Sequence, residues 1–163
     1  MTRLDSAIAR LKAQRVCLGF AAEALKGREG CVLELGLGNG RTYDHIRSLM
    51  PEREIYVFDR RIAAHPDTIP PEEYSFVGEM TETLPRAAET LRYAAVLVHG
   101  DIGGGGIEAS RRNAAEIGPL IVPLVQPDGL VMVDQELHCE GLVEMPLPEG
   151  VPLRRYFIYR RAD

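Results

Sequence analysis

The chain has 163 residues and a formal net charge of −5, with 45% hydrophobic and 26% charged residues. This length and balance predict one soluble globular domain with a hydrophobic core of its own. The negative charge gives no electrostatic attraction to nucleic acid or to an anionic membrane surface, so we expect neither as a partner.

The first 28 residues are predicted to form a helical cap. Apolar residues recur at helical spacing through residues 3–26, which predicts one or two helices with Gly27 as the stop. The segment is charged throughout and lacks the apolar core of a secretory signal. No stretch of the chain approaches the roughly 20 apolar residues of a membrane span. We therefore expect a cytoplasmic protein.

Residues 30–163 are predicted to alternate strands with helices. Strands are expected at 31–35, 54–58, 74–77, 94–98, 129–133, 142–147 and 155–160, and helices at 40–50, 83–92 and 107–117. This order predicts an α/β fold, a Rossmann-like doubly wound sheet that is mainly parallel, with antiparallel C-terminal strands and helices on both faces. We expect a single domain over residues 1–163, in which residues 30–163 form a cofactor-binding sheet.

The connection after the fifth predicted strand is short. Residues 134–141 separate it from the next strand, whereas a parallel crossover usually takes a dozen or more residues and carries a helix. Either residues 130–161 form an antiparallel meander, or the fifth strand is placed differently. In both cases one face of the sheet lacks a helix, and covering that face or edge is a reason to expect a homo-oligomer.

A glycine loop follows the first predicted strand in the segment ELGLGNGRT, residues 34–42. A nucleoside triphosphate would need a lysine in this loop, but the only lysines are Lys12 and Lys26. A dinucleotide would need GxGxxG, whereas here Arg41 stands in place of the last glycine. A nucleoside with a charged tail and no phosphates fits better, because glycines let it lie against bare backbone.

Polar or glycine residues also follow the other predicted strands. Ligands of a doubly wound sheet bind at the carboxyl ends of its strands. Those ends carry Asp59 after the second strand, residues 78–80 after the third, residues 99–101 after the fourth and residues 134–136 after the fifth. The Asp59 carboxylate could accept hydrogen bonds from both ribose hydroxyls of a nucleoside.

Three of these features resemble a known family. Glu34-x-Gly36-x-Gly38-x-Gly40 resembles the first motif of class I S-adenosylmethionine-dependent methyltransferases. Asp59 resembles their ribose-binding acid, and Asp101 in AVLVHGDIG resembles their fourth motif. The terminal RRYFIYRR is similar to the final antiparallel strand of that fold. The resemblance covers residues 30–135 well and the remainder loosely.

The resemblance implies S-adenosylmethionine as the cofactor. The glycine-loop backbone would pack on its methionine and ribose, with Glu34 beneath the loop near the amino group. Glu79 or Met80 would border the adenine, and residues 99–101 would line the methionine end. The implied cofactor-binding residues are Glu34, Gly36, Leu37, Gly38, Asn39, Gly40, Asp59, Arg60, Glu79, Met80, Gly100 and Asp101.

Methyl transfer from a sulfonium is an in-line displacement, so holding the acceptor in line can supply much of the catalysis. A base is needed only if the acceptor must lose a proton. Asp101 is the first candidate for an acceptor-side catalytic residue and His99 the second, as a base, with Tyr43 and Glu136 as further candidates. The Asn/Asp-Pro-Pro-Tyr/Phe pattern of amino-group methyltransferases is missing at HGDI, so a small-molecule acceptor is expected by elimination.

Two other functions remain open. A nicotinamide-dependent oxidoreductase is disfavoured by the glycine spacing, but a non-catalytic S-adenosylmethionine-binding protein would carry the same cofactor motif. The cysteines, Cys17, Cys31 and Cys139, are scattered without metal-ligand spacing, so we expect no metal site. Free thiols of this kind are typical of a reducing compartment.

Overall fold

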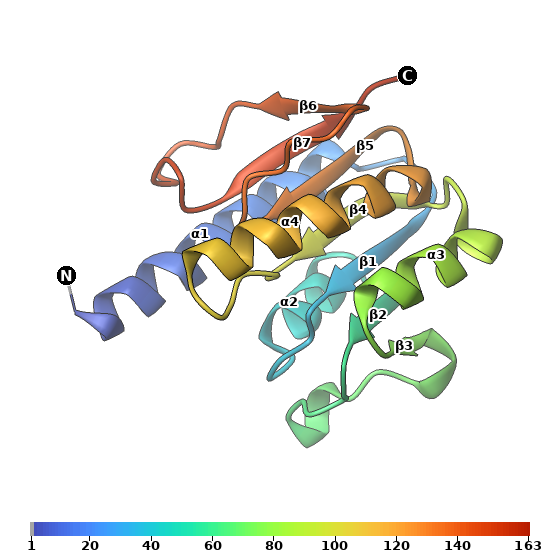
Figure 1. The fold of residues 1–163 in the computed structure, drawn as a ribbon, viewed down its shortest axis with the longest axis horizontal. Coiled ribbons are helices and arrows are strands. Elements are labelled where there is room, and N and C mark those ends of the chain that lie inside the picture. Colours follow the sequence, from blue (N-terminus) through green and yellow to red (C-terminus); the bar gives the residue numbers. More distant parts are fainter. Residues whose placement is uncertain (1) are drawn as a thin grey trace.

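Seven strands form one mixed sheet in the computed structural model, which describes residues 2–163. The strand order is β3-β2-β1-β4-β5-β7-β6 (Figure 1), and β7 runs antiparallel to both of its neighbours while the other pairs are parallel. The strands are β1 Cys31–Leu35, β2 Ile55–Asp59, β3 Ser75–Val77, β4 Ala95–Gly100, β5 Val125–Val133, β6 Leu142–Met145 and β7 Phe157–Arg161. This arrangement confirms the predicted α/β sheet.

Helices cover both faces of the sheet (Figure 1). One buried cluster joins α1 Arg3–Ala24 and α2 Arg41–Leu49 to the sheet, and a second joins α3 Met80–Leu91 and α4 Ile107–Ile121 to the opposite face. Short 3-10 turns lie at Pro66–Thr68, Glu72–Tyr74 and Val122–Leu124. The sheet therefore has a hydrophobic core on both faces.

No helix within residues 2–163 is both long and apolar enough to cross a membrane.

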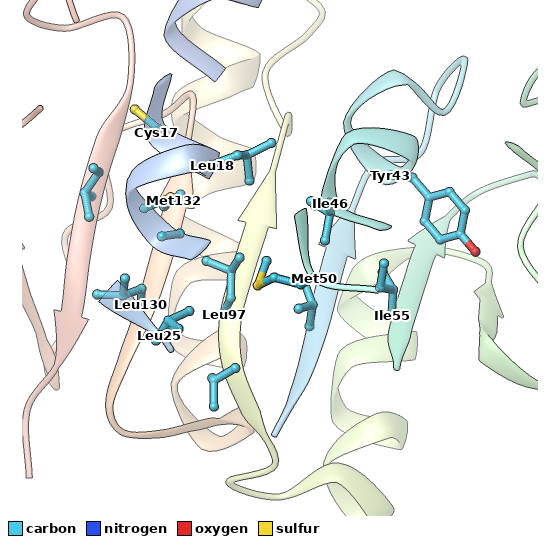
Figure 2. Packing of buried hydrophobic residues seen from close by; sticks show 14 of the residues in the cluster. Cys17, Leu18, Leu25, Tyr43, Ile46, Met50, Ile55, Leu97, Leu130 and Met132 are labelled. Atoms are coloured by element: carbon cyan, nitrogen blue, oxygen red, sulfur yellow. The ribbon is translucent and has the colours of Figure 1, made fainter. Parts of the chain in front are cut away.

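The N-terminal segment forms one helix. At its start the Thr2 hydroxyl accepts the Asp5 backbone N–H at 3.1 Å, and the Asp5 carboxylate accepts the Thr2 backbone N–H at 2.9 Å, a capping box. The buried residues begin at Ala13, and Figure 2 shows Leu18 and Leu25 in one cluster with Leu97 of β4. Residues 3–12 are exposed or half-buried. The second half of α1 therefore anchors the helix, and its first half extends past the packed core.

Strands β4 and β5 are longer than predicted. β4 runs to Gly100, so His99 lies inside the sheet with its side chain in the interior instead of in a loop. β5 begins at Val125, and its pairing with β4 is interrupted between Ala95 and Leu97. Asp128 in this stretch has a φ of 61°. Because of this irregularity, a prediction that relies on a regular strand pattern does not include residues 125–128 in β5.

Two helix boundaries also differ from the prediction. α3 begins at Met80 because the Glu79 carbonyl already accepts the N–H groups of Glu82 and Thr83, so Pro85 lies inside the helix. α4 continues through Pro119 to Ile121 and does not end near Gly118. In α4 the burial of Ile117, Gly118 and Ile121 against the sheet outweighs the local signal of Pro119.

An extended segment replaces the crossover helix between β5 and β6. β5 and β6 are both antiparallel to β7 and hence parallel to each other, so the first of the two predicted alternatives, an antiparallel meander, is wrong. Residues 134–141 run along the face that α3 and α4 cover, where the Leu137 N–H donates to the Tyr159 hydroxyl at 2.8 Å. A Cβ on Gly118 would lie 3.4 Å from the sulfur of Cys139. Gly118 therefore lets α4 approach residues 134–141 closely. This short segment covers the face of the sheet without forming a helix.

Candidate functional site

A cavity of about 860 Å³ lies at the carboxyl ends of the strands. The register brings these ends to one level, because Leu35 pairs with Phe58 of β2 and with Gly100 of β4. The lining of the cavity comes from α1, the glycine loop, the start of α2, the end of β2, the start of α3, the loop after β4 and α4. The lining residues are Arg10, Leu11, Gln14, Gly36, Leu37, Gly38, Asn39, Arg41, Thr42, Asp59, Arg60, Glu79, Met80, Thr81, Asp101, Ile102, Gly103, Gly104, Gly105, Ala109, Arg112, Asn113, Glu116 and Ile117.

The glycine loop presents bare backbone to this cavity. Its turn closes with the Gly40 N–H donating to the Leu37 carbonyl at 2.9 Å, and Gly36, Gly38 and Gly40 all have positive φ. A Cβ on Gly38 would meet no atom within 4 Å, so its face of the loop is open. A ligand can approach the main chain here as closely as an unsubstituted backbone allows.

Asp59 fastens the loop from the end of β2. One of its oxygens, Oδ2, accepts the N–H groups of Leu37 at 2.8 Å and of Gly38 at 3.2 Å. The carboxylate also lines the cavity. Because a carboxylate has about four acceptor sites, Asp59 can hold the loop and still accept hydroxyl donors from a ligand. Bare glycine backbone beside an acceptor of this kind fits a ribose and the chain attached to it.

Arg60 and Glu79 form an exposed ion pair at the rim of the cavity. The Arg60 Nε lies 3.0 Å from a Glu79 carboxylate oxygen, with 77% and 57% of the side chains exposed. Met80, the first residue of α3, lines the cavity beside them. These residues line a part of the cavity that is open to solvent. Because the ion pair is exposed, it contributes little to folding stability.

A buried polar network lies beneath the glycine loop. The Glu34 carboxylate accepts the Thr42 hydroxyl and lies 2.6 Å from the His99 Nδ1, and the Tyr156 hydroxyl contacts the other ring nitrogen. Glu34, His99 and Tyr156 are completely buried. Burial disfavours the imidazolium, but the charge and hydrogen bond of Glu34 outweigh it and raise the pKa of His99. Burial raises the pKa of Tyr156 well above its ordinary range.

Asp101 lines the cavity beside α1. Its carboxylate forms an ion pair with Arg10 and accepts a hydrogen bond from the Gln14 amide at 3.3 Å. Burial and the nearby charge of Asp134 raise the pKa of Asp101, although Arg10 acts in the opposite direction. This carboxyl group therefore holds a proton more readily than an ordinary aspartate.

The loop after β4 is a fixed wall of the cavity. Asp134 accepts the N–H groups of Ile102 and Gly103, and the Asn113 amide donates to the Ile102 carbonyl at 2.8 Å. The Gly104 N–H donates to the Ser110 hydroxyl at 2.9 Å. β5 and α4 therefore both hold the loop that carries Asp101.

The structure brings most of the predicted residues to one cavity. Those that line it are Gly36, Leu37, Gly38, Asn39, Asp59, Arg60, Glu79, Met80 and Asp101, whereas Glu34, Gly40, His99 and Gly100 do not. Gly40 packs against Thr68, where a Cβ would collide with the threonine hydroxyl. With both ring nitrogens engaged in the interior, His99 is not placed as a base for a ligand in the cavity.

The other candidate bases lie away from the cavity. Tyr43 is buried and accepts a hydrogen bond from Arg47, and Glu136 lies near the exposed His138. Sequence reasoning missed Arg10, Gln14, Arg112 and Asn113. Arg10 and Gln14 are four residues apart and so share a face of α1, the one signal that could have identified them.

Comparisons with known proteins agree with this geometry. Residues 1–161 match the family model described as S-adenosyl-L-methionine methyltransferase. A crystal structure of an S-adenosyl-L-methionine methyl transferase from Silicibacter pomeroyi DSS-3 is 47% identical, with a TM-score of 0.95 and 99% of each chain covered.

More distant structures share the fold alone. The CurJ carbon methyltransferase is 12% identical, with a TM-score of 0.63 over 92% of this chain and 54% of that one. TrmN from Thermus thermophilus is 15% identical, with a TM-score of 0.59 over 90% of this chain and 48% of that one. A search of curated proteins finds no match.

Proposed function

Because the chain belongs to the S-adenosyl-L-methionine methyltransferase family, and so uses that cofactor, we propose that it methylates a small molecule bound between α1, the loop after β4 and α4. The observation that carries this proposal is the composition of the cavity lining. The glycine loop, Asp59 and the start of α3 line the same cavity as α1, the loop after β4 and α4. A cavity of about 860 Å³ suits small ligands, whose sites are typically about 300–1,000 Å³.

The cofactor end is assigned by the chemistry of its donors and acceptors. The glycine-loop backbone would hold the methionine and ribose portions, and the Asp59 carboxylate would accept the ribose hydroxyls. Arg60, Glu79 and Met80 would border the adenine. Glu34 has both oxygens engaged by Thr42 and His99, so we propose that it supports the loop from beneath.

The acceptor end contains the group best placed to take up a proton. When bound, S-adenosyl-L-methionine supplies an activated methyl group whose departure leaves a neutral thioether. Asp101 has a raised pKa and lines the cavity, and a base works best when its pKa approaches the working pH. A donor group of the acceptor would take the place of Arg10 beside the Asp101 carboxylate. We assign His99 the role of a positioning residue within the buried network.

The proposal leads to a direct experiment. Calorimetry with S-adenosyl-L-methionine, S-adenosyl-L-homocysteine and NAD should show micromolar binding of the first two and none of NAD. Release of S-adenosyl-L-homocysteine is then measured across small hydroxyl, amine and thiol acceptors, with RNA and protein as controls. Turnover only with RNA or protein would contradict a small-molecule acceptor, and binding without any turnover would indicate a non-catalytic binding protein.

Two further properties belong to this proposal. The three cysteine thiols are free, as in a reducing compartment, and we propose a cytoplasmic location. β3 and β6 are the two edges of the sheet, and Val77 and Val143 on them are about half exposed. Pairing of such edges would support a homo-oligomer. Light scattering that shows a monomer at micromolar concentration would argue against it.

A further inference from the structure

We propose that Asp134 is a positioning residue for methyl transfer: it fixes the wall of the cavity that carries Asp101. This inference rests on the function proposed above and extends it to a residue outside the cavity lining. Three features of the structure support it: the hydrogen bonds of Asp134, the close approach at Gly103 and the charges around Asp101.

The first feature is the set of donors that converge on Asp134. This residue directly follows β5, and its carboxylate accepts the N–H of Ile102 at 2.8 Å and of Gly103 at 3.1 Å. The Gln135 amide donates to the same carboxylate at 3.1 Å. Two of the three donors belong to the residues that follow Asp101. The carboxylate therefore ties the loop after β4 to the end of β5.

The second feature is a close approach that only glycine permits. A Cβ on Gly103 would lie 2.5 Å from the Asp134 Oδ2 and 2.5 Å from the Gln135 side-chain nitrogen. The loop backbone and the Asp134 carboxylate are therefore in direct contact with no side chain between them. Since α4 holds the same loop through Asn113 and Ser110, the wall is held from two sides.

The third feature is electrostatic. The groups that interact with Asp101 are Arg10 and Gln14 of α1, Asp134 directly after β5, and the buried His99 and Tyr156. After burial, the negative charge of Asp134 is the largest influence that raises the pKa of Asp101, and Arg10 opposes it. Without Asp134, the Asp101 carboxylate would have a lower affinity for a proton.

The consequence for methyl transfer follows from proton balance. The acceptor nucleophile, a hydroxyl or a neutral amine, forms a bond to the methyl carbon as the carbon–sulfur bond breaks, and the proton that the acceptor atom carries must then pass to a base. A base with a raised pKa takes this proton more effectively. Asp134 would therefore promote the reaction of acceptors that carry such a proton.

The full chain without ligand is sufficient to test the electrostatic effect of Asp134. The carboxyl resonance of Asp101 is titrated by ¹³C NMR in the wild type, in Asp134→Asn and in the control Glu136→Gln. The control removes the same charge two residues further along, from an exposed side chain outside the cavity. We expect Asp134→Asn to lower the pKa of Asp101 and the control to leave it unchanged.

Amide hydrogen exchange tests the positioning part separately. In Asp134→Ala the Ile102 and Gly103 amides should exchange at least about tenfold faster, because they lose their acceptor. The Gly104 amide, bonded to Ser110, should change much less. Gly103→Ala forces the same contact apart without removing a charge and should accelerate exchange at Ile102 as well, so the contact remains testable if an Asp134 variant folds poorly.

The outcomes separate this inference from the proposed function. An unchanged Asp101 titration in Asp134→Asn, or unchanged exchange at Ile102 and Gly103 in Asp134→Ala, would overturn the role of Asp134. Absence of S-adenosyl-L-methionine binding by the wild type would instead overturn the proposed cofactor site. Neither the titration nor the exchange measurement needs ligand, so either proposal can fail while the other stands.

Discussion

Glu34 and His99 lie opposite each other on the adjacent parallel strands β1 and β4, with the His99 Nδ1 2.6 Å from a Glu34 carboxylate oxygen and both side chains completely buried. Thr42 of α2 and Tyr156 of the C-terminal segment complete the hydrogen bonding. The network therefore joins β1, β4, α2 and the C-terminal segment directly beneath the glycine loop. A buried charge in such a place depends on its partner.

Glu34→Gln should destabilise the fold strongly. The change removes the charge, keeps the volume and leaves His99 without its anionic partner, and breaking a buried pair in this way costs about 3–5 kcal/mol. Urea denaturation measures the loss. The control is Glu23→Gln, which removes the partner of Lys26 from an exposed ion pair and should cost at most about 1 kcal/mol. Equal effects of the two changes would contradict a structural role for the network.

The buried pair should also make stability depend on pH. Because the folded state raises the pKa of His99, the pair stabilises the fold fully below the unfolded pKa of about 6.5, and this contribution is lost as the pH rises through the higher folded value. The free energy of unfolding of the wild type, relative to His99→Gln, should therefore fall as the pH rises above about 6.5. A difference that stays constant or rises over this range would mean that His99 is neutral in the folded protein.

The sequence predicted the fold because its strongest signals are local. Continuous apolar strands separated by amphipathic helices specify a parallel sheet with two covered faces. The failures lie where tertiary packing overrides a local signal: α4 passes through Pro119, and residues 134–141 cross without a helix. The close contact between Cys139 and Gly118 makes this short crossing possible. Because it joins distant parts of the chain, it leaves no periodic pattern in the sequence.

The cavity could be predicted only in part for the same reason. The glycine loop and Asp59 belong to a motif with fixed spacing, and both line the cavity. The apolar spacing of α1 predicts only that it is a helix, whereas Arg10 of this helix reaches Asp101 across 91 residues of sequence. The prediction of His99 as a base assumed that β4 ends at Val98. The strand continues to Gly100, which places the imidazole in the interior.

Asp59→Asn should weaken the binding of S-adenosyl-L-methionine. The amide keeps one oxygen for the glycine loop but loses the charge that strengthens hydrogen bonds from ribose hydroxyls. Such bonds are worth about 1.5–3 kcal/mol, which corresponds to roughly a tenfold to hundredfold loss of affinity by calorimetry. Asp67→Asn is the matched control, because its exposed carboxylate lies outside the cavity lining. Unchanged affinity in Asp59→Asn would show that the ribose is held elsewhere.

Alanine substitutions at Gly36 and Gly38 should separate folding from cofactor binding. Both residues have positive φ, 84° and 51°, so each change costs about 1 kcal/mol of backbone strain. At Gly36 the new Cβ would also lie 2.8 Å from the Asp101 carbonyl oxygen, so urea denaturation should show a larger loss of stability there.

At Gly38 the methyl group meets no protein atom within 4 Å and projects from a residue that lines the cavity. Gly38→Ala should therefore fold with the smaller loss but bind S-adenosyl-L-methionine at least about tenfold more weakly, because the methyl group holds the ligand away from the backbone. Wild-type affinity in Gly38→Ala would mean that the cofactor does not lie against this part of the loop.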